Sequence, residues 1–327
     1  MLYPQTKPRH DNFFRHLPIP VLMNRREFLS KSLQGTAFLS AASLPINSLA
    51  SSKKTMQKGS GFTMWQLNTQ CNEIGNSYVF LTREGQVVVM DGGCSTDEYY
   101  LRGFLAHMGN HVHTWFISHP HSDHMDSLIS ILKEPRGITI NRIVHSPFTE
   151  DLINSEPDYA AHCRHFYHLL LQVNNIEIVE LNSPGWTEDI GGLNFKILGV
   201  SNPEIIHNGY NNSSMIIKVW DKKKSILFLA DAGEECGDKL LSSPFRQELD
   251  CDYVQMAHHG QRGCRQSFYQ SIHFRACLWS TPQWVWDNNT GNGPGTGHLK
   301  TEETRQWMKE KGITEHHVSW KGLYQLD

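Results

Sequence analysis

The feature that most constrains this chain is a run of three histidines and one aspartate within six residues. It reads His-Pro-His-Ser-Asp-His over residues 119–124 and follows an apolar stretch, residues 112–118, that predicts a buried strand. Burying so many polar groups at one corner is costly unless each is paired, and protonated histidines would repel one another. A divalent cation removes both problems, so the run predicts a metal site.

The spacing within the run divides its side chains between two places. His119 and His121 are alternate residues of an extended segment and project together, whereas Asp123 and His124 turn toward a neighbouring position. We therefore expect two adjacent cations. A solvated histidine-rich loop is the alternative, but the flanking strand and helix patterns favour the metal site.

Apolar segments of strand length alternate with helical patterns through the rest of the chain. Strands are expected at residues 62–67, 77–82, 86–90, 113–118, 138–144, 176–181, 193–200, 215–220, 225–229, 253–257 and 276–279. Helices are expected at residues 97–108, 126–132, 158–173, 234–241 and 301–311. No long linker rich in Pro, Ser or Gly divides these segments. The pattern predicts one α/β body with helices outside the sheet layers.

The N-terminal segment has the pattern of an address signal. Arg25 and Arg26 precede a moderately apolar, small-residue stretch that ends in Ser-Leu-Ala at Ala50. This resembles a twin-arginine export signal, which a receptor reads; a buried amphipathic helix is the alternative. The resemblance implies that the export machinery is a partner and that the mature protein is periplasmic or secreted, without a transmembrane span.

These observations divide the chain into four parts. Residues 1–22 are expected to be an unstructured or non-native extension, residues 23–50 the export signal and residues 51–61 a linker, leaving residues 62–327 as the folded domain. The formal net charge of −3 argues against strong binding to nucleic acid.

Two further strand patterns end in residues that can bind metal. Residues 225–229 run into Asp231, and residues 253–257 run into His258 and His259. Read alone, Asp231 is also suitable as a helix N-cap. Together with the first run, these residues resemble the metal motifs of the metallo-β-lactamase superfamily. The His-His-Gly run at residues 258–260 resembles the corresponding motif of the ComEC-like branch of that superfamily.

The resemblance implies a fold and a ligand set. The fold is an αββα sandwich, in which two face-to-face mixed β-sheets are flanked by helices. Asp231 is implied to bridge both metals, and one of His258 and His259 to bind the second; His258 is slightly preferred because it follows the strand first. Asp91, in an Asp-Gly-Gly turn, is expected to support the site without binding metal.

Many members of this family have a further metal-binding histidine between the first run and the bridging aspartate. In this chain, no histidine before Asp231 lies in a matching context. His207 is a candidate ligand, although an ordered loop residue is the favoured interpretation. The Asn-Asn-Ser-Ser stretch that contains Asn212 matches a polar loop of the ComEC-like branch. His298, in a Gly-His loop, and Trp284 and Trp286, in a tryptophan-rich segment, are candidate substrate contacts; core packing is the alternative for the indoles.

The resemblance implies an exported hydrolase that uses a hydroxide bridging two divalent metal ions. Zinc suits the mixed His/Asp set, and manganese or iron are also accepted by such ligands. Asp123 is expected to orient the attacking water or accept its proton, besides binding metal. The favoured substrate is a phosphoester or phosphodiester. The alternatives are a lactone or β-lactam hydrolase, a di-iron oxidoreductase and a non-catalytic envelope binding protein.

Overall fold

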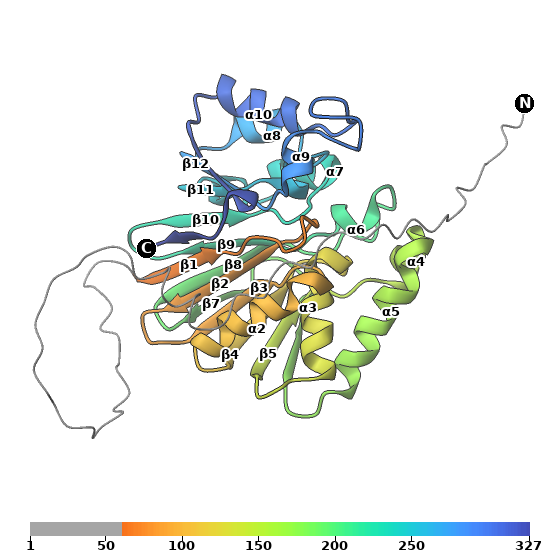
Figure 1. The fold of residues 1–327 in the computed structure, drawn as a ribbon, viewed down its shortest axis with the longest axis vertical. Coiled ribbons are helices and arrows are strands. Elements are labelled where there is room, and N and C mark those ends of the chain that lie inside the picture. Colours follow the sequence, from red (N-terminus) through yellow and green to blue (C-terminus); the bar gives the residue numbers. More distant parts are fainter. Residues whose placement is uncertain (1–60) are drawn as a thin grey trace, which may run out of the picture. The chain divides into compact units, whose positions relative to one another are not determined.

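The computed structural model describes residues 61–327, in which two seven-stranded β-sheets pack face to face (Figure 1). The first sheet has the order β14-β1-β2-β3-β4-β5-β6 and the second the order β13-β12-β11-β10-β9-β8-β7. The strands are β1 (Phe62–Gln66), β2 (Ser77–Thr82), β3 (Val87–Asp91), β4 (His111–Ile117), β5 (Thr139–His145), β6 (Glu177–Glu180), β7 (Thr187–Ile190), β8 (Leu193–Gly199), β9 (Ile216–Trp220), β10 (Ser225–Phe228), β11 (Tyr253–Gln255), β12 (Ala276–Trp279), β13 (Glu315–Val318) and β14 (Tyr324–Leu326).

Helices cover the outer faces of the two sheets. The α-helices are α2 (Glu98–His107), α3 (Ser122–Lys133), α4 (Glu150–Ser155), α5 (Pro157–Gln172), α6 (Gly209–Asn212), α7 (Glu234–Ser242), α8 (Gln266–Ser271), α9 (Gln283–Trp286) and α10 (Thr301–Glu310). Short 3-10 helices are η1 (Ser95–Asp97), η2 (Arg246–Glu248), η3 (Ala257–Gly260) and η4 (Ser319–Lys321).

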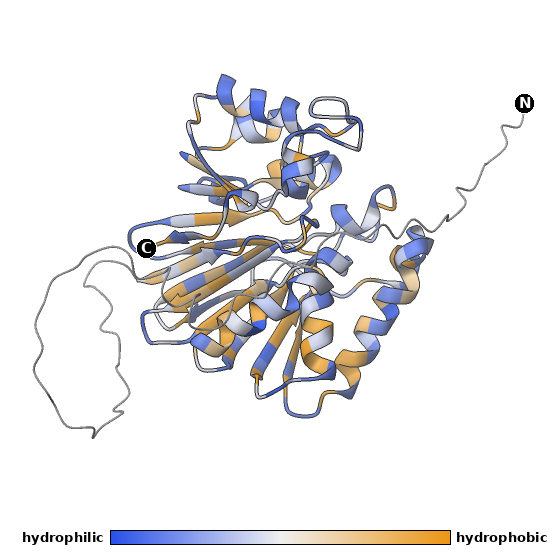
Figure 2. Cartoon of the chain, in the orientation of Figure 1, coloured by the Kyte–Doolittle hydropathy of each residue, from blue (hydrophilic) through white to orange (hydrophobic). Residues whose placement is uncertain are grey.

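Alternating apolar side chains explain why the sheets are buried on both faces. In β2, Tyr78 and Phe80 point toward the second sheet while Val79 points toward the helices. The Phe80 and Phe228 rings meet across the sandwich at 5.8 Å in a T-shaped contact. Figure 2 shows hydrophobic residues gathered along the strands of both sheets. The region between the sheets is therefore the central core.

Each sheet also has an outer core under its helices. Leu128 of α3 and Phe166 of α5 pack on the first sheet, and Leu240 of α7 and Phe268 of α8 pack on the second. Each such buried side chain stabilises the fold by about 2 kcal/mol. The four layers confirm the predicted αββα sandwich.

The structure adds three strands that the apolar pattern did not predict. β7, β13 and β14 are three of the four edge strands of the two sheets. They are only three or four residues long and carry several polar side chains, as expected at an edge that must resist further pairing. Helix α3 begins at Ser122, four residues before the predicted start, so Asp123 and His124 lie in its first turn.

In both sheets, parallel pairing brings the ends of neighbouring strands to one edge. β3, β4, β5 and β6 pair in parallel in the first sheet, and β10, β11, β12 and β13 do so in the second. The loops that leave the carboxyl ends of these strands are where α/β proteins place their functional residues.

The expected extension, export signal and nearly all of the linker lie outside the described residues. Within residues 61–327, no helix combines the length and the apolar character needed to cross a bilayer.

Candidate metal centre

The first histidine pair lies directly after β4. His119 Nε2 and His121 Nδ1 face each other at 3.0 Å. Both side chains are buried. With one carboxylate oxygen of Asp231, their nitrogens form a group whose members all lie within 4.8 Å of one another. This is a first candidate metal position.

A second candidate position lies beside the first. Asp123, His124, Asp231 and His259 offer donor atoms that lie within 4.8 Å of one another. His259 Nε2 is 2.9 Å from Asp123 Oδ2 and 3.3 Å from Asp231 Oδ2, and His124 Nε2 is 3.1 Å from Asp231 Oδ1. Asp231 belongs to both groups, which is the arrangement that a bridging carboxylate requires.

Several of these atoms fit a metal better than they fit one another. His124 Nε2, His259 Nε2 and Asp231 Oδ1 are buried without a hydrogen bond of good geometry among the described residues. Buried polar atoms without partners are costly, and such convergence at one point is the signature of ligands. The donor set of imidazoles and carboxylates therefore fits two divalent cations.

Asp91 orients His124 from behind. Its Oδ2 lies 2.8 Å from His124 Nδ1, and its carboxylate also accepts hydrogen bonds from the backbone and hydroxyl of Ser118 and from the amide of Asn76. Asp91 holds a left-handed φ of 60° at the end of β3. With the proton of His124 on Nδ1, the lone pair of Nε2 is directed at the site.

His259 is fixed in the same way by the second sheet. Its Nδ1 donates to the carbonyl of Ser280, which follows β12, at 2.8 Å. His258 and His259 both adopt left-handed backbone angles, with φ of 51° and 55°, and Gly260 follows with φ of 80°. This tight turn after β11 aims His259 at Asp123. Consecutive left-handed residues are costly and persist where the surrounding structure holds them.

Charge pairing governs protonation in the metal-free cluster. Burial alone would lower the pKa of His124, but Asp231 and Asp91 raise that pKa well above its ordinary value. Burial likewise opposes the charged form of His259, yet Asp231 and Asp123 raise its pKa to about 10. Burial would raise the pKa of Asp231, but His259 and His124 bring it well below the ordinary value.

His119 has the opposite behaviour. Burial, reinforced by the neighbouring His124 and His121, holds its pKa well below the ordinary value. A neutral imidazole is the form that binds a metal, so the first position has a ligand that needs no deprotonation.

The structure places His259 in the metal-binding group and His258 at its rim. His258 Nε2 lies 3.8 Å from Asp231 Oδ2, and neither metal group includes this histidine. The preference for His258, which rested on its position directly after the strand, does not match this geometry, because the left-handed turn swings the second histidine inward.

Three other candidates from the sequence do not line the pocket that opens over the two metal groups. The His207 side chain is 88% exposed and its Nδ1 is 3.6 Å from Glu235. Asn212 is buried, and its Oδ1 accepts the backbone N–H of Cys236 at the start of α7. It therefore caps a helix and does not line the pocket. His298 does not line the pocket either.

The two candidate tryptophans have different surroundings. Trp284 lines the pocket, and its Nε1 donates to the carbonyl of Asn72. Trp286 packs edge-on against Trp279 at 5.2 Å and lies under the guanidinium of Arg305. The structure thus leaves one indole in position to touch a substrate and uses the other in packing.

A pocket of about 440 Å³ opens over both metal positions. Its wall includes four polar or aromatic residues that the sequence motifs did not single out, Glu73, Glu156, Tyr159 and Gln261. These four come from loops and helix ends with no motif of their own, so only the fold brings them together. The wall also includes Asn211, which belongs to the Asn-Asn-Ser-Ser stretch, although the sequence analysis chose its neighbour Asn212 as the candidate.

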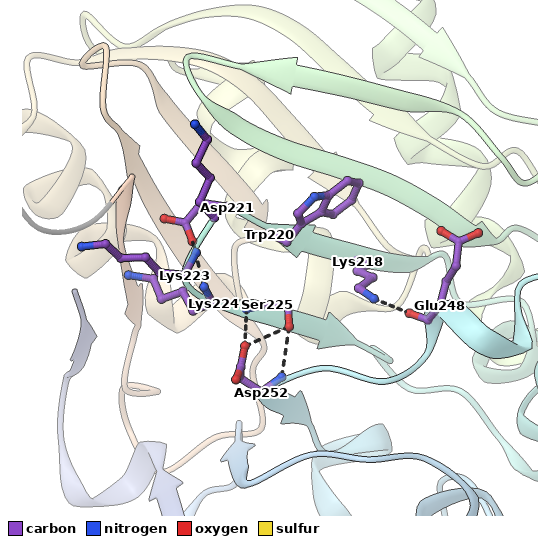
Figure 3. A pocket seen from close by; sticks show the side chains of 9 residues that line it. Lys218, Trp220, Asp221, Lys223, Lys224, Ser225, Glu248 and Asp252 are labelled. Atoms are coloured by element: carbon purple, nitrogen blue, oxygen red, sulfur yellow. Dashed lines mark hydrogen bonds between the residues drawn. The ribbon is translucent and has the colours of Figure 1, made fainter.

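A second hollow, of about 370 Å³, lies at the other end of β10 (Figure 3). It holds Lys218, Lys222, Lys223 and Lys224 together with Asp221, Glu248 and Asp252. Lys218 Nζ donates to the carbonyls of Glu248 and Asp250, and Asp221 accepts the backbone N–H groups of Lys223 and Lys224. Within the described residues, this hollow contains no metal-ligating cluster.

The fold and the site define an αββα protein with a candidate dinuclear metal centre. Residues 72–268, more than half of the chain, match the family model of the metallo-β-lactamase superfamily. The chain belongs to this superfamily and is thereby a metal-dependent hydrolase, as the sequence resemblance predicted.

Solved structures support the same fold. The metallo-β-lactamase fold protein YhfI from Bacillus subtilis is similar with a TM-score of 0.52 and 10% identity, over 81% of this chain and 99% of that chain. A mutant of the CmlA β-hydroxylase is similar with a TM-score of 0.50 and 12% identity, over 82% of this chain and 54% of that chain. No curated protein matches the sequence.

Proposed function

We propose that this protein is a dinuclear metal-dependent hydrolase of a phosphodiester or phosphoester. The observation that carries the proposal is the sharing of Asp231 between two groups of buried donors, His119 and His121 on one side and Asp123, His124 and His259 on the other. Two bound divalent cations would lower the pKa of a water between them and neutralise charge on the reacting group. Zinc suits this donor set, with manganese or iron as alternatives.

The chain's own residues orient the reaction. Asp123 is partly exposed, and its carboxylate lies beside His259 and lines the pocket, so it would contact both a bound metal and a molecule in the pocket. This supports its proposed role in orienting that water or accepting its proton. His258, at the rim beside Asp231, is placed to contact the substrate.

The charge of the pocket supports a substrate that carries few negative charges. Among the described residues, no lysine or arginine lines the pocket, whereas Glu73 and Glu156 do. Bound metals would then be the main partners for substrate anions. A phosphodiester with a single negative charge suits such a pocket better than a polyphosphate, which would need further cationic side chains.

The test compares substrates on protein with measured metal content. Two equivalents of metal and hydrolysis of bis(p-nitrophenyl) phosphate are expected, with slower turnover of a cephalosporin and of a homoserine lactone. Preferential turnover of either ring substrate would replace the phosphodiester with a lactam or lactone. Phosphodiester turnover that survives His119→Ala would refute the site, and two tightly bound irons without hydrolysis would favour an oxidoreductase. A metal-free, inactive protein would favour a binding role.

We further propose export by the twin-arginine route and membership of the ComEC-like branch. The supporting features are the Arg25-Arg26 pair before the small-residue stretch and the His-His-Gly run. Cell fractionation of the full chain should find it outside the cytoplasm, and replacing Arg25 and Arg26 together by lysine should retain it inside. If the wild type and the double-lysine variant are distributed in the same way between the cytoplasm and the outside, the export proposal is refuted.

A further inference from the structure

Glu156 connects three parts of the chain beside the first metal position. It is the single residue between α4 and α5, and its side chain is 19% exposed. Its Oε1 accepts the backbone N–H of Tyr210 in α6 at 3.0 Å. Its Oε2 lies 3.3 Å from Nε2 of His121. The carboxylate thus joins the helix junction and the α6 loop to a candidate metal ligand.

These contacts decide which nitrogen of His121 carries its proton. Nδ1 faces His119 Nε2 at 3.0 Å, on the side of the metal group, and Nε2 faces Glu156. A carboxylate only accepts hydrogen bonds, so Nε2 must be the protonated nitrogen and Nδ1 keeps its lone pair for a metal. The Tyr210 ring stacks on the imidazole at 5.1 Å and 22°, which fixes the plane of the ring.

The first metal position has more need of such support than the second. Its group contains three residues, His119, His121 and Asp231, whereas the second group contains four. A metal held by fewer protein ligands depends more on the orientation and basicity of each. A carboxylate behind a ligating imidazole supplies both.

We propose that Glu156 is a positioning residue that sets the metal affinity of the first position through His121. This inference rests on the proposed dinuclear site. Glu156 is not part of either group of converging donors, so it acts on the metal through the imidazole and not as a ligand.

The test separates the charge of Glu156 from its structural contact. Glu156→Gln keeps an oxygen for the Tyr210 N–H but replaces the charged acceptor behind His121 by a neutral amide. Zinc binding to the metal-free protein is measured by competition with a chromophoric chelator, together with thermal unfolding of the metal-free form. One of the two binding steps should weaken by about 10- to 100-fold, while the other step and the metal-free Tm stay at their wild-type values.

The matched control lies on the same helix pair. Glu150 of α4 pairs with Arg164 of α5 at 2.7 Å on the surface. Glu150→Gln removes one negative charge at a similar place in the sequence, so both binding steps should remain unchanged.

The outcomes distinguish this inference from the proposed function. Two unchanged steps in Glu156→Gln would overturn the inference alone, as would equal weakening of both steps with a lower metal-free Tm, which indicates a structural role. Wild-type protein that binds no metal would instead overturn the proposed function. Should Glu156→Gln fail to fold, nitrogen NMR of the metal-free wild type at alkaline pH decides: a His121 protonated on Nε2 supports the inference and one protonated on Nδ1 overturns it.

Discussion

His259 Nε2 lies 2.9 Å from Asp123 Oδ2, although the two residues follow strands of different sheets. Asp123 is in the first turn of α3, after β4 of the first sheet, and His259 is in the turn after β11 of the second. The packing of the two sheets is therefore what completes the second metal position.

The two adjacent histidines should differ sharply in a metal-binding assay. His259→Ala removes a nitrogen directed at Asp123 and Asp231, so one equivalent of metal should be lost and hydrolysis should fall by about 100-fold or more. His258→Ala should keep both equivalents, because this residue lies at the rim. Elemental analysis and phosphodiester turnover measure both effects. Loss of metal in His258→Ala with full retention in His259→Ala would reverse the assignment.

Metal binding at neutral pH should release protons. In the metal-free protein, Asp231 and its neighbours raise the pKa of His259 to about 10 and that of His124 well above its ordinary value, so both imidazoles carry protons at pH 7. A metal binds the neutral form, so each gives up its proton on binding. Affinity should therefore rise with pH, and calorimetric titrations in two buffers of different ionisation enthalpy should give different heats. Identical heats would contradict the protonated cluster.

The turn that carries His259 should not tolerate a side chain at Gly260. A Cβ there would lie 2.4 Å from the ring of Trp279, and φ is 80°. Gly260→Ala should cost about 2–4 kcal/mol of unfolding free energy and lower metal content. Gly192 has a similar φ of 85° with nothing within 4 Å, so Gly192→Ala isolates the backbone cost, about 1 kcal/mol. Denaturant unfolding compares the pair; equal losses would refute the steric explanation.

His145 should make the fold sensitive to mild acid. It is buried beside the rings of Phe166 and Tyr167, and burial lowers its pKa from 6.5 to about 4. The unfolded chain therefore binds a proton in this range that the folded chain does not, so stability is full above pH 6.5 and falls as the pH drops toward 4.

His145→Phe removes this titration. As the pH falls from about 7.5 to about 5, the free energy of unfolding of the variant should rise by about 2 kcal/mol relative to that of the wild type. Urea unfolding of both proteins at the two pH values measures the difference. A constant difference would show that His145 does not titrate as its burial requires.

Much of the fold was predictable because its central strands are apolar on both faces. β2 and β10 alternate side chains between two cores, which makes them conspicuous as continuous apolar runs. The edge strands β7, β13 and β14 were not predictable in this way. They owe their pairing to neighbours already in place, and their polar residues carry no periodic signal.

The sequence by itself determined the chemistry of the metal centre. The residue types and spacing from His119 to His124 predict metal ligands at a strand end, since few other environments accommodate three imidazoles and a carboxylate so close together. Only the tertiary structure decided which residues from other segments contact these ligands. The left-handed turn selects His259 over His258, and the helix junction places Glu156 behind His121. Such choices depend on the relative positions of distant backbone segments, which local sequence patterns do not encode.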